Sequence, residues 1–322
     1  MTLQNGETFD HYKITTHMAQ GGTGDVYRAV DMNTGSEVAL KIPMRETVLD
    51  PARYELFLRE LEALRVLDHP AVQHFVESGR QGSTPYLVTE LVSGRSLRSI
   101  LKECGFLSPD RALALTRRIA VGLLYCHSLN VVHRDLKPDN IYITGNDQPV
   151  ILDFGLALTP ARPGAGKATG TIDYVSPEQI RGQRGDKRTD IYGLGMTLYE
   201  MLAGQPPYIS DDPEDPTDLL NKHLYAAVPR LDQINPGISP QVATLVARCI
   251  QRDPDGRYDD MEALIHDLDH LESIDSSALE DLTTAPARPS LFKTQAGTVV
   301  LILGAFIGFI ALVTLLAVAA KR

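Results

Sequence analysis

Two short polar stretches near the middle of the chain carry the groups that the transfer of a phosphoryl group needs. Residues 133–140 read His-Arg-Asp-Leu-Lys-Pro-Asp-Asn, and residues 153–155 read Asp-Phe-Gly. They offer carboxylates that accept protons or bind hard cations, an amide, and a lysine that neutralises negative charge. Because phosphoryl transfer depends mostly on positioning and charge neutralisation, such groups in fixed places are what this chemistry requires.

The stretch 133–140 is too specific to be an ordinary solvated loop. Eight specified residues in a row arise by chance with a probability of ~10⁻¹⁰ per position at ordinary residue frequencies. The stretch resembles the signature of the eukaryotic-type (Hanks-type) protein kinases. The resemblance covers about residues 11–271. In detail, the residues of this region are most similar to those of bacterial membrane-anchored receptor-type Ser/Thr kinases.

This resemblance implies a role for each polar residue of the two stretches. Asp135 takes the place of the catalytic base, and Lys137 the place of the cation that neutralises charge on the transferred group. Asn140 and Asp153 match the two residues that hold magnesium. The implied cofactors are ATP and Mg²⁺, and the implied acceptors are Ser/Thr hydroxyls of proteins.

Residues 38–41, Val-Ala-Leu-Lys, fit the family's third strand, which carries a lysine for the phosphates. Because strand side chains alternate, Ala39 and Lys41 face the same side, so a small residue lies against adenine while the ammonium reaches the phosphates. Glu60, in a predicted helix over 54–67, matches the glutamate that pairs with this lysine. At about 4 Å and an effective dielectric near 20, such a pair attracts by ~4 kcal/mol before desolvation, enough to orient the lysine.

Residues 19–26, Ala-Gln-Gly-Gly-Thr-Gly-Asp-Val, stand where the family has its phosphate-covering loop. Alanine replaces the first glycine of the pattern, but the remaining glycines still allow backbone amides to approach phosphate. We expect weaker or altered nucleotide affinity at most. The candidate nucleotide-contacting residues of this loop are Ala19, Gly21, Gly22, Gly24 and Val26.

Further matches concern the hinge between two lobes and the segment that controls activity. Backbone groups of Glu90 and Val92 are expected to bond adenine, with the small Thr89 at the gatekeeper position. Arg134 precedes the catalytic Asp135, and kinases of this kind usually need that arginine neutralised by an activation-loop phosphate. The candidate regulatory threonines are Thr169, as an autophosphorylation site, and Thr171, for the substrate platform.

Three other matches are interpreted as structural. Glu178 and Arg257 match a buried ion pair that braces the helical lobe, and Asp190 matches the anchor of the catalytic loop. The Gly-Thr-Ile-Asp-Tyr-Val-Ser-Pro-Glu stretch at 170–178 and Arg257 favour a protein substrate over a small molecule.

Short alternating segments come first along the chain, and helical segments follow. Residues 37–42 and 84–89 alternate between turn residues, as sheet strands do. Ser-Pro-Asp at 108–110 supplies an N-cap, a first-turn proline and an acid, and a helical pattern continues to about residue 129. The expected fold class is therefore α+β, the bilobal protein kinase fold with a small β-rich lobe and a large α-helical lobe. Further helices are predicted over 189–203, 239–251 and 258–271.

The predicted domains are an extension (1–10), the kinase domain (11–271, with lobes of about 11–91 and 92–271), a flexible juxtamembrane linker (272–296) and a transmembrane helix (297–320).

Residues 297–320 form an uncharged run of 24 residues, which as a helix extends ~36 Å and crosses a bilayer with some tilt. A buried core helix is the alternative. The amino terminus carries no secretory signal pattern, so we expect a single-pass tail anchor with the kinase domain facing the cytoplasm. Gly304 and Gly308 have the spacing of a helix-dimerisation motif, which predicts a homodimer unless they are only packing filler.

The net charge of −10 argues against nucleic acid as a partner, because no basic excess neutralises phosphates. Cys104, Cys126 and Cys249 lie far apart and are expected to be buried thiols. Two functions of different classes remain: an active kinase, and a pseudokinase acting as a membrane-tethered nucleotide-binding scaffold. The presence of all six expected polar residues favours the first, and only Ala19 favours the second.

Overall fold

The computed structural model describes residues 3–20, 24–154, 172–212 and 215–285, and the chain divides into two units, Met1–Thr284 and Ala285–Arg322. The predicted membrane span, with Gly304 and Gly308, lies outside the described residues. Among the residues that are described, no helix has the length and apolar character that a bilayer crossing needs.

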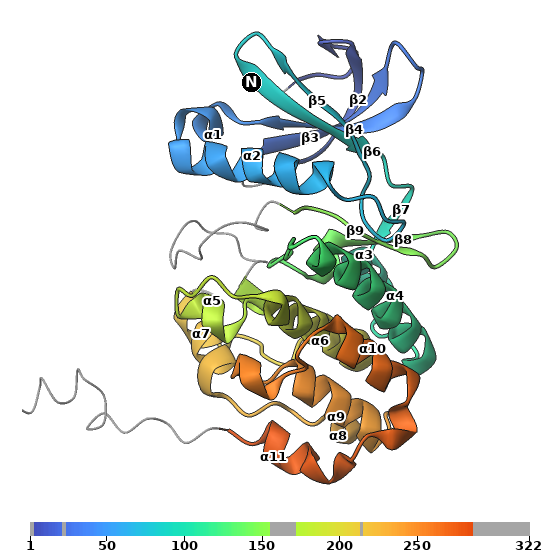
Figure 1. Ribbon diagram of the computed structural model, residues 1–322, viewed down its shortest axis with the longest axis vertical. Coiled ribbons are helices and arrows are strands. Elements are labelled where there is room, and N and C mark those ends of the chain that lie inside the picture. The colour runs from blue at the N-terminus through green and yellow to red at the C-terminus, as the bar shows by residue number, and fades with distance from the viewer. Residues whose placement is uncertain (1–2, 21–23, 155–171, 213–214, 286–322) are drawn as a thin grey trace, which may run out of the picture. The chain divides into compact units, whose positions relative to one another are not determined.

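The first lobe is built on an antiparallel sheet of six strands in the order β1-β2-β3-β4-β6-β5 (Figure 1). The predicted strands 37–42 and 84–89 are confirmed as β4 (Glu37–Pro43) and β6 (Thr84–Glu90). Residues 3–10, predicted as an extension, contribute β1, whose Phe9 pairs with Tyr12 of β2. The other strands are β1 (Thr8–Phe9), β2 (Tyr12–Gln20), β3 (Gly24–Asp31) and β5 (Phe75–Gln81).

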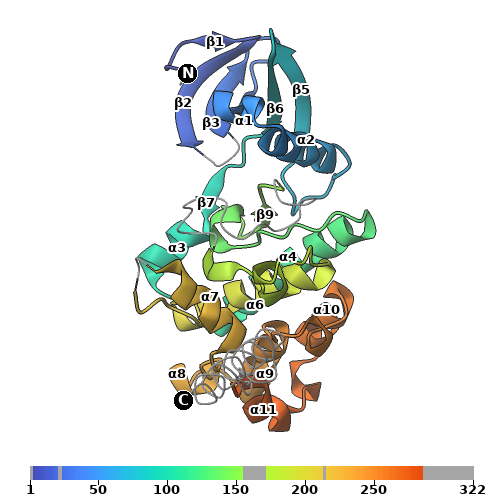
Figure 2. The same ribbon diagram turned by 90° about the vertical axis from the view of Figure 1, so that its left-hand side faces the viewer.

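Alternation along these strands places one set of side chains in the core of the lobe. Ile14, Leu40 and Val88 are completely buried, and Lys41 projects from the next position of β4. Helices α1 (Arg45–Leu49) and α2 (Pro51–Arg65) follow β4, and both views show α2 lying along the sheet (Figure 2). The helix α2 confirms the predicted helix 54–67 and carries Glu60.

The second lobe is helical. Its central helices α4 (Pro109–Ser128) and α6 (Lys187–Ala203) pack on each other. The Ser108 side chain accepts a hydrogen bond from the Arg111 amide and Pro109 occupies the first turn, as the sequence predicts. All of residues 189–202 are buried, because α6 is surrounded by the rest of the lobe. The remaining helices are α3 (Leu97–Cys104), α5 (Pro177–Ile180), α7 (Pro216–Tyr225), α8 (Leu231–Ile234), α9 (Pro240–Cys249), α10 (Met261–Asp269) and α11 (Leu279–Thr283).

The expectation that all three cysteines are buried was wrong for Cys104, which is exposed. The core face of α3 is formed by Leu97 and Leu101, which are one turn apart, and Cys104 ends the helix outside that face.

A small sheet carries the catalytic segments on the second lobe. It has the order β7-β8-β9, with β7 (Gly94–Ser96), β8 (Ile141–Thr144) and β9 (Pro149–Ile151). The single turn η1 (Pro138–Asn140) leads into β8, and Val72 bridges to Ile151. Residues 133–140 and 153–154 therefore emerge at the same sheet.

The prediction of a flexible linker from residue 272 was wrong for residues 272–284. This stretch forms η4 (Leu271–Ser273), η5 (Ser276–Ala278) and α11. Leu279 is buried, and the Thr283 carbonyl accepts a hydrogen bond from the Val228 amide. Polar composition concealed the few apolar residues that attach this segment to α9.

Candidate active site

A cavity of about 240 Å³ is lined by residues of both lobes. Ala39 and Lys41 face it from β4, Glu60 and Leu64 from α2, and Asp153 from the segment after β9. Apolar walls with a few convergent polar groups are typical of a ligand site. The other lining residues are Met18, Ala19, Val26, Gln73, Leu87, Thr89, Leu91, Val92, Asp139, Asn140, Tyr142 and Leu152.

The predicted ion pair between Lys41 and Glu60 is present at the back of this cavity. The Lys41 Nζ lies 2.7 and 2.8 Å from the two carboxylate oxygens of Glu60, and 3.6 Å from Asp153 Oδ1. Burial opposes the charge on Lys41, but Asp153 and Glu60 outweigh it and hold the pKa of Lys41 above its usual value. The lysine is therefore a fixed cation that faces the cavity.

The loop of residues 133–140 brings a carboxylate, a cation and an amide together. Lys137 Nζ lies 2.7 Å from Asp135 Oδ2. The Asn140 amide donates to the Asp135 carbonyl at 2.8 Å and to its carboxylate at 3.1 Å. Burial raises the pKa of the Asp135 carboxyl, and Lys137 opposes that rise. This places a base of increased proton affinity beside a cation.

Asp190 of α6 fixes the backbone of this loop, as expected of the anchor. Its carboxylate accepts the amide of His133 at 2.8 Å and that of Arg134 at 2.7 Å, and lies 2.7 Å from His127 Nε2. Arg134 has a positive φ of 65°, a conformation that non-glycine residues rarely adopt and that these bonds hold. The Arg134 carbonyl accepts the Gln179 side chain at 2.9 Å, so α5 holds the loop as well.

Phe154 orients the carboxylate of Asp153. Its ring is completely buried and meets the His133 ring edge to face at 4.8 Å. The His133 Nε2 in turn lies 2.9 Å from the Leu152 carbonyl, and Asp153 itself has φ of 61°. With Phe154 turned into the core, the side chain of Asp153 faces the cavity and is half exposed.

Asn140 and Asp153 are suited to a magnesium ion. The Asn140 nitrogen bonds to Asp135, which leaves its amide oxygen as an acceptor, and both residues line the cavity. No group of three or more His, Cys, Asp or Glu side chains in the described part of the chain could hold a metal. Mg²⁺ keeps several waters and is usually bound through one or two protein oxygens together with substrate phosphates, so this sparse pair fits it.

The hinge contains a contact that the sequence did not predict. The Gln73 side chain donates to the carbonyl of Glu90 at 3.2 Å, and the Glu90 amide donates to the His74 carbonyl at 2.9 Å. Val92 lines the cavity with Leu91. The Glu90 carbonyl has a second lone pair for a ligand, but Gln73 already fixes its direction.

A sequence model of the protein kinase domain matches residues 12–268 of this chain. The chain belongs to the protein kinase family. A probable serine/threonine-protein kinase of Streptomyces coelicolor is 33% identical over 267 aligned residues, covering 80% of this chain and 39% of that protein. The serine/threonine-protein kinase PknB of Mycolicibacterium smegmatis is 33% identical over 267 residues, covering 77% of this chain and 41% of that protein. The serine/threonine-protein kinase PknL of Mycobacterium tuberculosis is 35% identical over 270 residues, 83% of this chain and 67% of that protein.

The kinase fold is also found in the crystal structure of the Mycobacterium tuberculosis PknI kinase domain. That structure has a TM-score of 0.67 and 22% identity, and the match covers 85% of this chain and 100% of that one. The bilobal kinase fold predicted for residues 11–271 is thus confirmed. The chain spans less than half the length of the Streptomyces and Mycolicibacterium relatives it matches.

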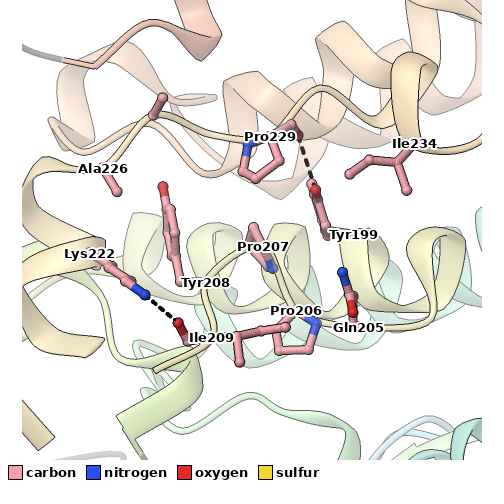
Figure 3. A pocket seen from close by; sticks show the side chains of 11 residues that line it. Tyr199, Gln205, Pro206, Pro207, Tyr208, Ile209, Lys222, Ala226, Pro229 and Ile234 are labelled. Carbon is pink, nitrogen blue, oxygen red and sulfur yellow. Dashed lines mark hydrogen bonds between the residues drawn. The ribbon is translucent and has the colours of Figure 1, made fainter. Parts of the chain in front are cut away.

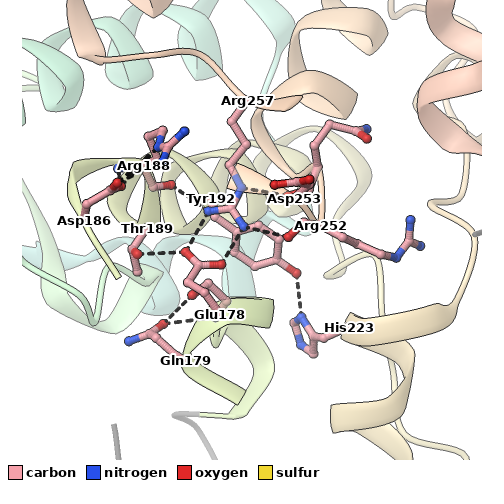
Figure 4. A network of polar contacts seen from close by, with 12 residues as sticks. Glu178, Gln179, Asp186, Arg188, Thr189, Tyr192, His223, Arg252, Asp253 and Arg257 are labelled. Atoms are coloured by element: carbon pink, nitrogen blue, oxygen red, sulfur yellow. Dashed lines mark hydrogen bonds and ion pairs between the residues drawn. The ribbon is translucent and has the colours of Figure 1, made fainter. Parts of the chain in front are cut away.

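A buried polar network braces the kinase domain below the cleft (Figure 4). The Arg257 guanidinium donates to the two oxygens of Glu178 at 2.8 and 2.7 Å, and Thr189 donates to the same carboxylate at 2.8 Å. Arg257 also lies 4.9 Å from the centre of the Tyr192 ring. The predicted structural ion pair is therefore present, and it joins α5, α6 and the segment before α10.

A second hollow, of about 280 Å³, lies between α6, α7 and α8 and carries no catalytic groups (Figure 3). The Tyr199 hydroxyl donates to the Pro229 carbonyl at 3.0 Å, and the Lys222 ammonium donates to the Ile209 carbonyl at 2.6 Å. Lys222 is also paired with Asp211 and Asp218. Tyr199 and Lys222 hold the chain around this hollow, and none of the predicted catalytic residues lines it, so the interlobe cavity is the candidate site.

Most of the predicted site residues meet at this cavity or support it. Gly21 and Gly22 of the phosphate-covering loop and the threonines Thr169 and Thr171 lie outside the described residues. Gly24 is described, and its backbone runs so close to Ile42 that a Cβ would clash with the Ile42 carbonyl oxygen. Sequence reasoning missed several lining residues, among them Leu64 and Gln73. Leu64 is one turn after Glu60 and was detectable by helical spacing, whereas Gln73 carried no signal.

Proposed function

We propose that this kinase domain transfers the γ-phosphoryl group of ATP to serine or threonine hydroxyls of proteins. The observation that carries the proposal is that Lys41, Asn140 and Asp153 line one cleft, with Lys41 paired to Glu60 and the Asn140 amide donating to the carboxylate of Asp135. The fixed Lys41 ammonium would hold phosphate oxygens, and Asp135 would accept the proton of the incoming hydroxyl. A pseudokinase scaffold has no comparable support, because none of these groups is missing or misplaced.

Mg²⁺ would be held by the Asp153 carboxylate and the Asn140 amide oxygen, and would neutralise charge on the phosphates when bound. Lys137, 2.7 Å from Asp135, would stabilise charge on the transferred group. The buried Phe154 and the anchor Asp190 would keep these groups in place.

Autophosphorylation is part of the proposal. Burial and the neighbouring Arg184 lower the pKa of the Arg134 guanidinium, while Asp190 and Asp186 oppose this shift. A phosphate on Thr169 near Arg134, the residue before the base Asp135, would form charge-assisted hydrogen bonds that order the segment.

Phosphate transfer from [γ-³²P]ATP tests this function, with the full chain in detergent and a general protein acceptor. Lys41→Met should lower incorporation into acceptor and kinase by about 10²-fold or more, because a fixed cation for the phosphates is lost. Lys13→Met, on β2, is the matched control and should leave incorporation unchanged. Equal incorporation by wild type and Lys41→Met would refute the assigned role, and unmodified residues 159–171 in active protein would refute autophosphorylation at Thr169.

We also propose that residues 297–320 anchor the chain in a membrane, with the kinase domain on the cytoplasmic side and Gly304 and Gly308 at a homodimer contact. The support is the uncharged run itself. The full chain should float with phospholipid vesicles through a density gradient, whereas a chain ending after Ala285 should stay at the bottom. Flotation of both, or of neither, would contradict the anchor.

A further inference from the structure

Two exposed histidines lie next to each other at the end of α10, the helix that packs on α4 (Figure 1). His266 is in the last turn of α10 and His270 follows its last residue, so they are four positions apart. Their rings are stacked, with centres 4.6 Å apart and planes inclined by 27°. Residues four apart on a helix share a face, and two histidines at this spacing recur in zinc sites. Neither histidine takes part in the transfer chemistry described above.

Hydrogen bonds decide which nitrogen of each ring carries the proton. The Nδ1 of His270 lies 2.8 Å from the carbonyl oxygen of His266, and the Nδ1 of His266 lies 3.3 Å from a carboxylate oxygen of Asp267. A carbonyl and an ionised carboxylate only accept, so each Nδ1 is the donor. In the neutral ring the lone pair is therefore on Nε2. Within the described part of the chain, no hydrogen bond engages the Nε2 of either ring.

A metal-binding imidazole needs this arrangement of its two nitrogens. In protein metal sites the ligating histidine usually donates its other N–H to a carboxylate or a backbone carbonyl, which orients the ring and makes the free nitrogen more basic. His266 has a carboxylate in that place, and His270 has a carbonyl. Asp269 acts electrostatically on both rings and is itself held by Arg117 of α4 at 2.6 and 2.8 Å. The two rings are thus oriented by their surroundings, with both free nitrogens available.

The stacking of these rings gains little without a ligand. The His266 side chain is 66% exposed, so the contact removes little apolar surface from water. Two stacked imidazoles also repel each other once both are protonated, as like charges one helical turn apart do. A cation shared by the two rings removes this objection, because it requires both of them to be neutral.

We propose that His266 and His270 bind a divalent transition-metal ion of the zinc class through their two Nε2 atoms, with water completing its coordination. No group of three or more His, Cys, Asp or Glu side chains in the described part of the chain could hold a metal, so water fills the other positions. The site is therefore weaker than a structural zinc site with four protein ligands. Imidazole suits zinc, copper and nickel, whereas Mg²⁺ prefers oxygen, so this site and the one at Asn140 and Asp153 take different ions. The bound ion joins the end of α10 to η4, where the carboxyl-terminal segment begins.

Calorimetric titration of the full chain in detergent with ZnCl₂, without nucleotide and in excess Mg²⁺, tests the site. Wild type should bind Zn²⁺ at a site that Mg²⁺ does not displace. His266→Gln and His270→Gln should each weaken this binding by about tenfold or more, because one of two protein ligands is lost. The matched control is His74→Gln, which removes a single exposed imidazole from the other lobe and should leave the affinity unchanged. This test does not depend on the proposed kinase function, since it measures no phosphate transfer.

Two further measurements identify the ligands and the effect on the fold. The electron paramagnetic resonance spectrum of wild type with one equivalent of Cu²⁺ should show coupling to two imidazole nitrogens, and that of either single variant to fewer. Zn²⁺ at ten times its dissociation constant should raise the Tm of wild type by about 2 °C or more, but not that of His266→Gln/His270→Gln.

Three results would overturn the inference. The first is a double variant that binds Zn²⁺ as tightly as wild type does. The second is a wild-type spectrum with Cu²⁺ coupled to a single imidazole nitrogen or to none. The third is an absence of saturable binding by wild type up to millimolar Zn²⁺.

Discussion

Asp135→Asn should lower kcat for phosphate transfer by about 10²–10⁴-fold, the usual contribution of a positioned general base. The asparagine keeps the shape of the side chain, and its oxygen can still accept from Lys137 and Asn140, which contact Asp135 in the wild type. Nucleotide affinity should change by less than about twofold, because Asp135 is not among the residues that line the cavity. Steady-state kinetics and a titration with a fluorescent ATP analogue measure the two quantities separately.

The pH profile gives this prediction a second measurement. The active form of the base is the carboxylate, and burial raises the pKa of Asp135 above its usual 3.8. Wild-type kcat/KM should therefore fall as the pH falls through a pKa above 3.8, and the residual activity of Asp135→Asn should lack this fall.

Asp269→Asn is the matched control, since it makes the same chemical change in a surface pair with Arg117. It should have wild-type kinetics, because exposed pairs contribute little. An Asp135→Asn enzyme within tenfold of wild type, or one whose affinity for nucleotide falls in parallel with its rate, would contradict the role of base.

Local sequence was sufficient to predict those parts of the structure that depend on interactions between neighbouring residues. The helix from Pro109 to Ser128 begins at the predicted N-cap because Ser108, its proline and its acid act within one turn. Residues 133–140 were equally readable, since a contiguous motif holds the base, the cation and the amide within one loop. Here the expected interactions span only a few residues, as in the bond from Asn140 to Asp135.

Interactions between distant segments were predictable only where the family resemblance supplied both partners. Glu60 and Asp190 were found in this way, although they lie 19 residues from Lys41 and 57 from His133. The Arg98 guanidinium donates to the carboxylate of Glu200, which lies 102 residues further along the chain, and no local sequence pattern predicts this contact. Gln73 is similar, because its bond to the Glu90 carbonyl depends on how two strands align.

The carboxyl-terminal part of the domain shows a different failure. Residues 272–284 contain serine, threonine and acids, which are typical of a linker, and yet Leu279 and Thr283 are buried. The Gln251 side chain donates to the Leu282 carbonyl, which satisfies the backbone of a short helix. A helix of this length forms through tertiary contacts and not through propensity, so composition gave the wrong answer.

Replacement of Arg257 by methionine should destabilise the domain by about 3–5 kcal/mol, because it leaves the Glu178 carboxylate buried without a counter-charge. Arg257 is 2% exposed and also donates to the carbonyls of Gln251 and Arg188, which lose a partner as well. Urea unfolding followed by circular dichroism is suitable, because the chain has no tryptophan.

The free energy of unfolding that Arg257→Met loses should become smaller as the pH falls. In the wild type, burial opposes ionisation of Glu178, but Arg257 outweighs it and holds the pKa below 4.5, so the pair's stabilisation persists until the pH falls below that range. In Arg257→Met the Glu178 carboxyl has lost its counter-charge but is still buried, so its pKa rises. Protonation then removes the cost of burying a charged carboxylate. The difference in free energy of unfolding between variant and wild type should therefore shrink between pH 7 and pH 5.

The double variant Arg257→Met/Glu178→Met separates loss of a counter-charge from loss of packing. Replacement of both partners by apolar groups removes the uncompensated charge, so the double variant should be more stable than Arg257→Met alone. The surface pair offers the comparison: Arg117→Met, which breaks only the contact with Asp269, should cost less than about 1 kcal/mol. If Arg257→Met and Arg117→Met cost the same, or the double variant is no more stable than Arg257→Met, then the buried pair does not brace the helical lobe through its charge.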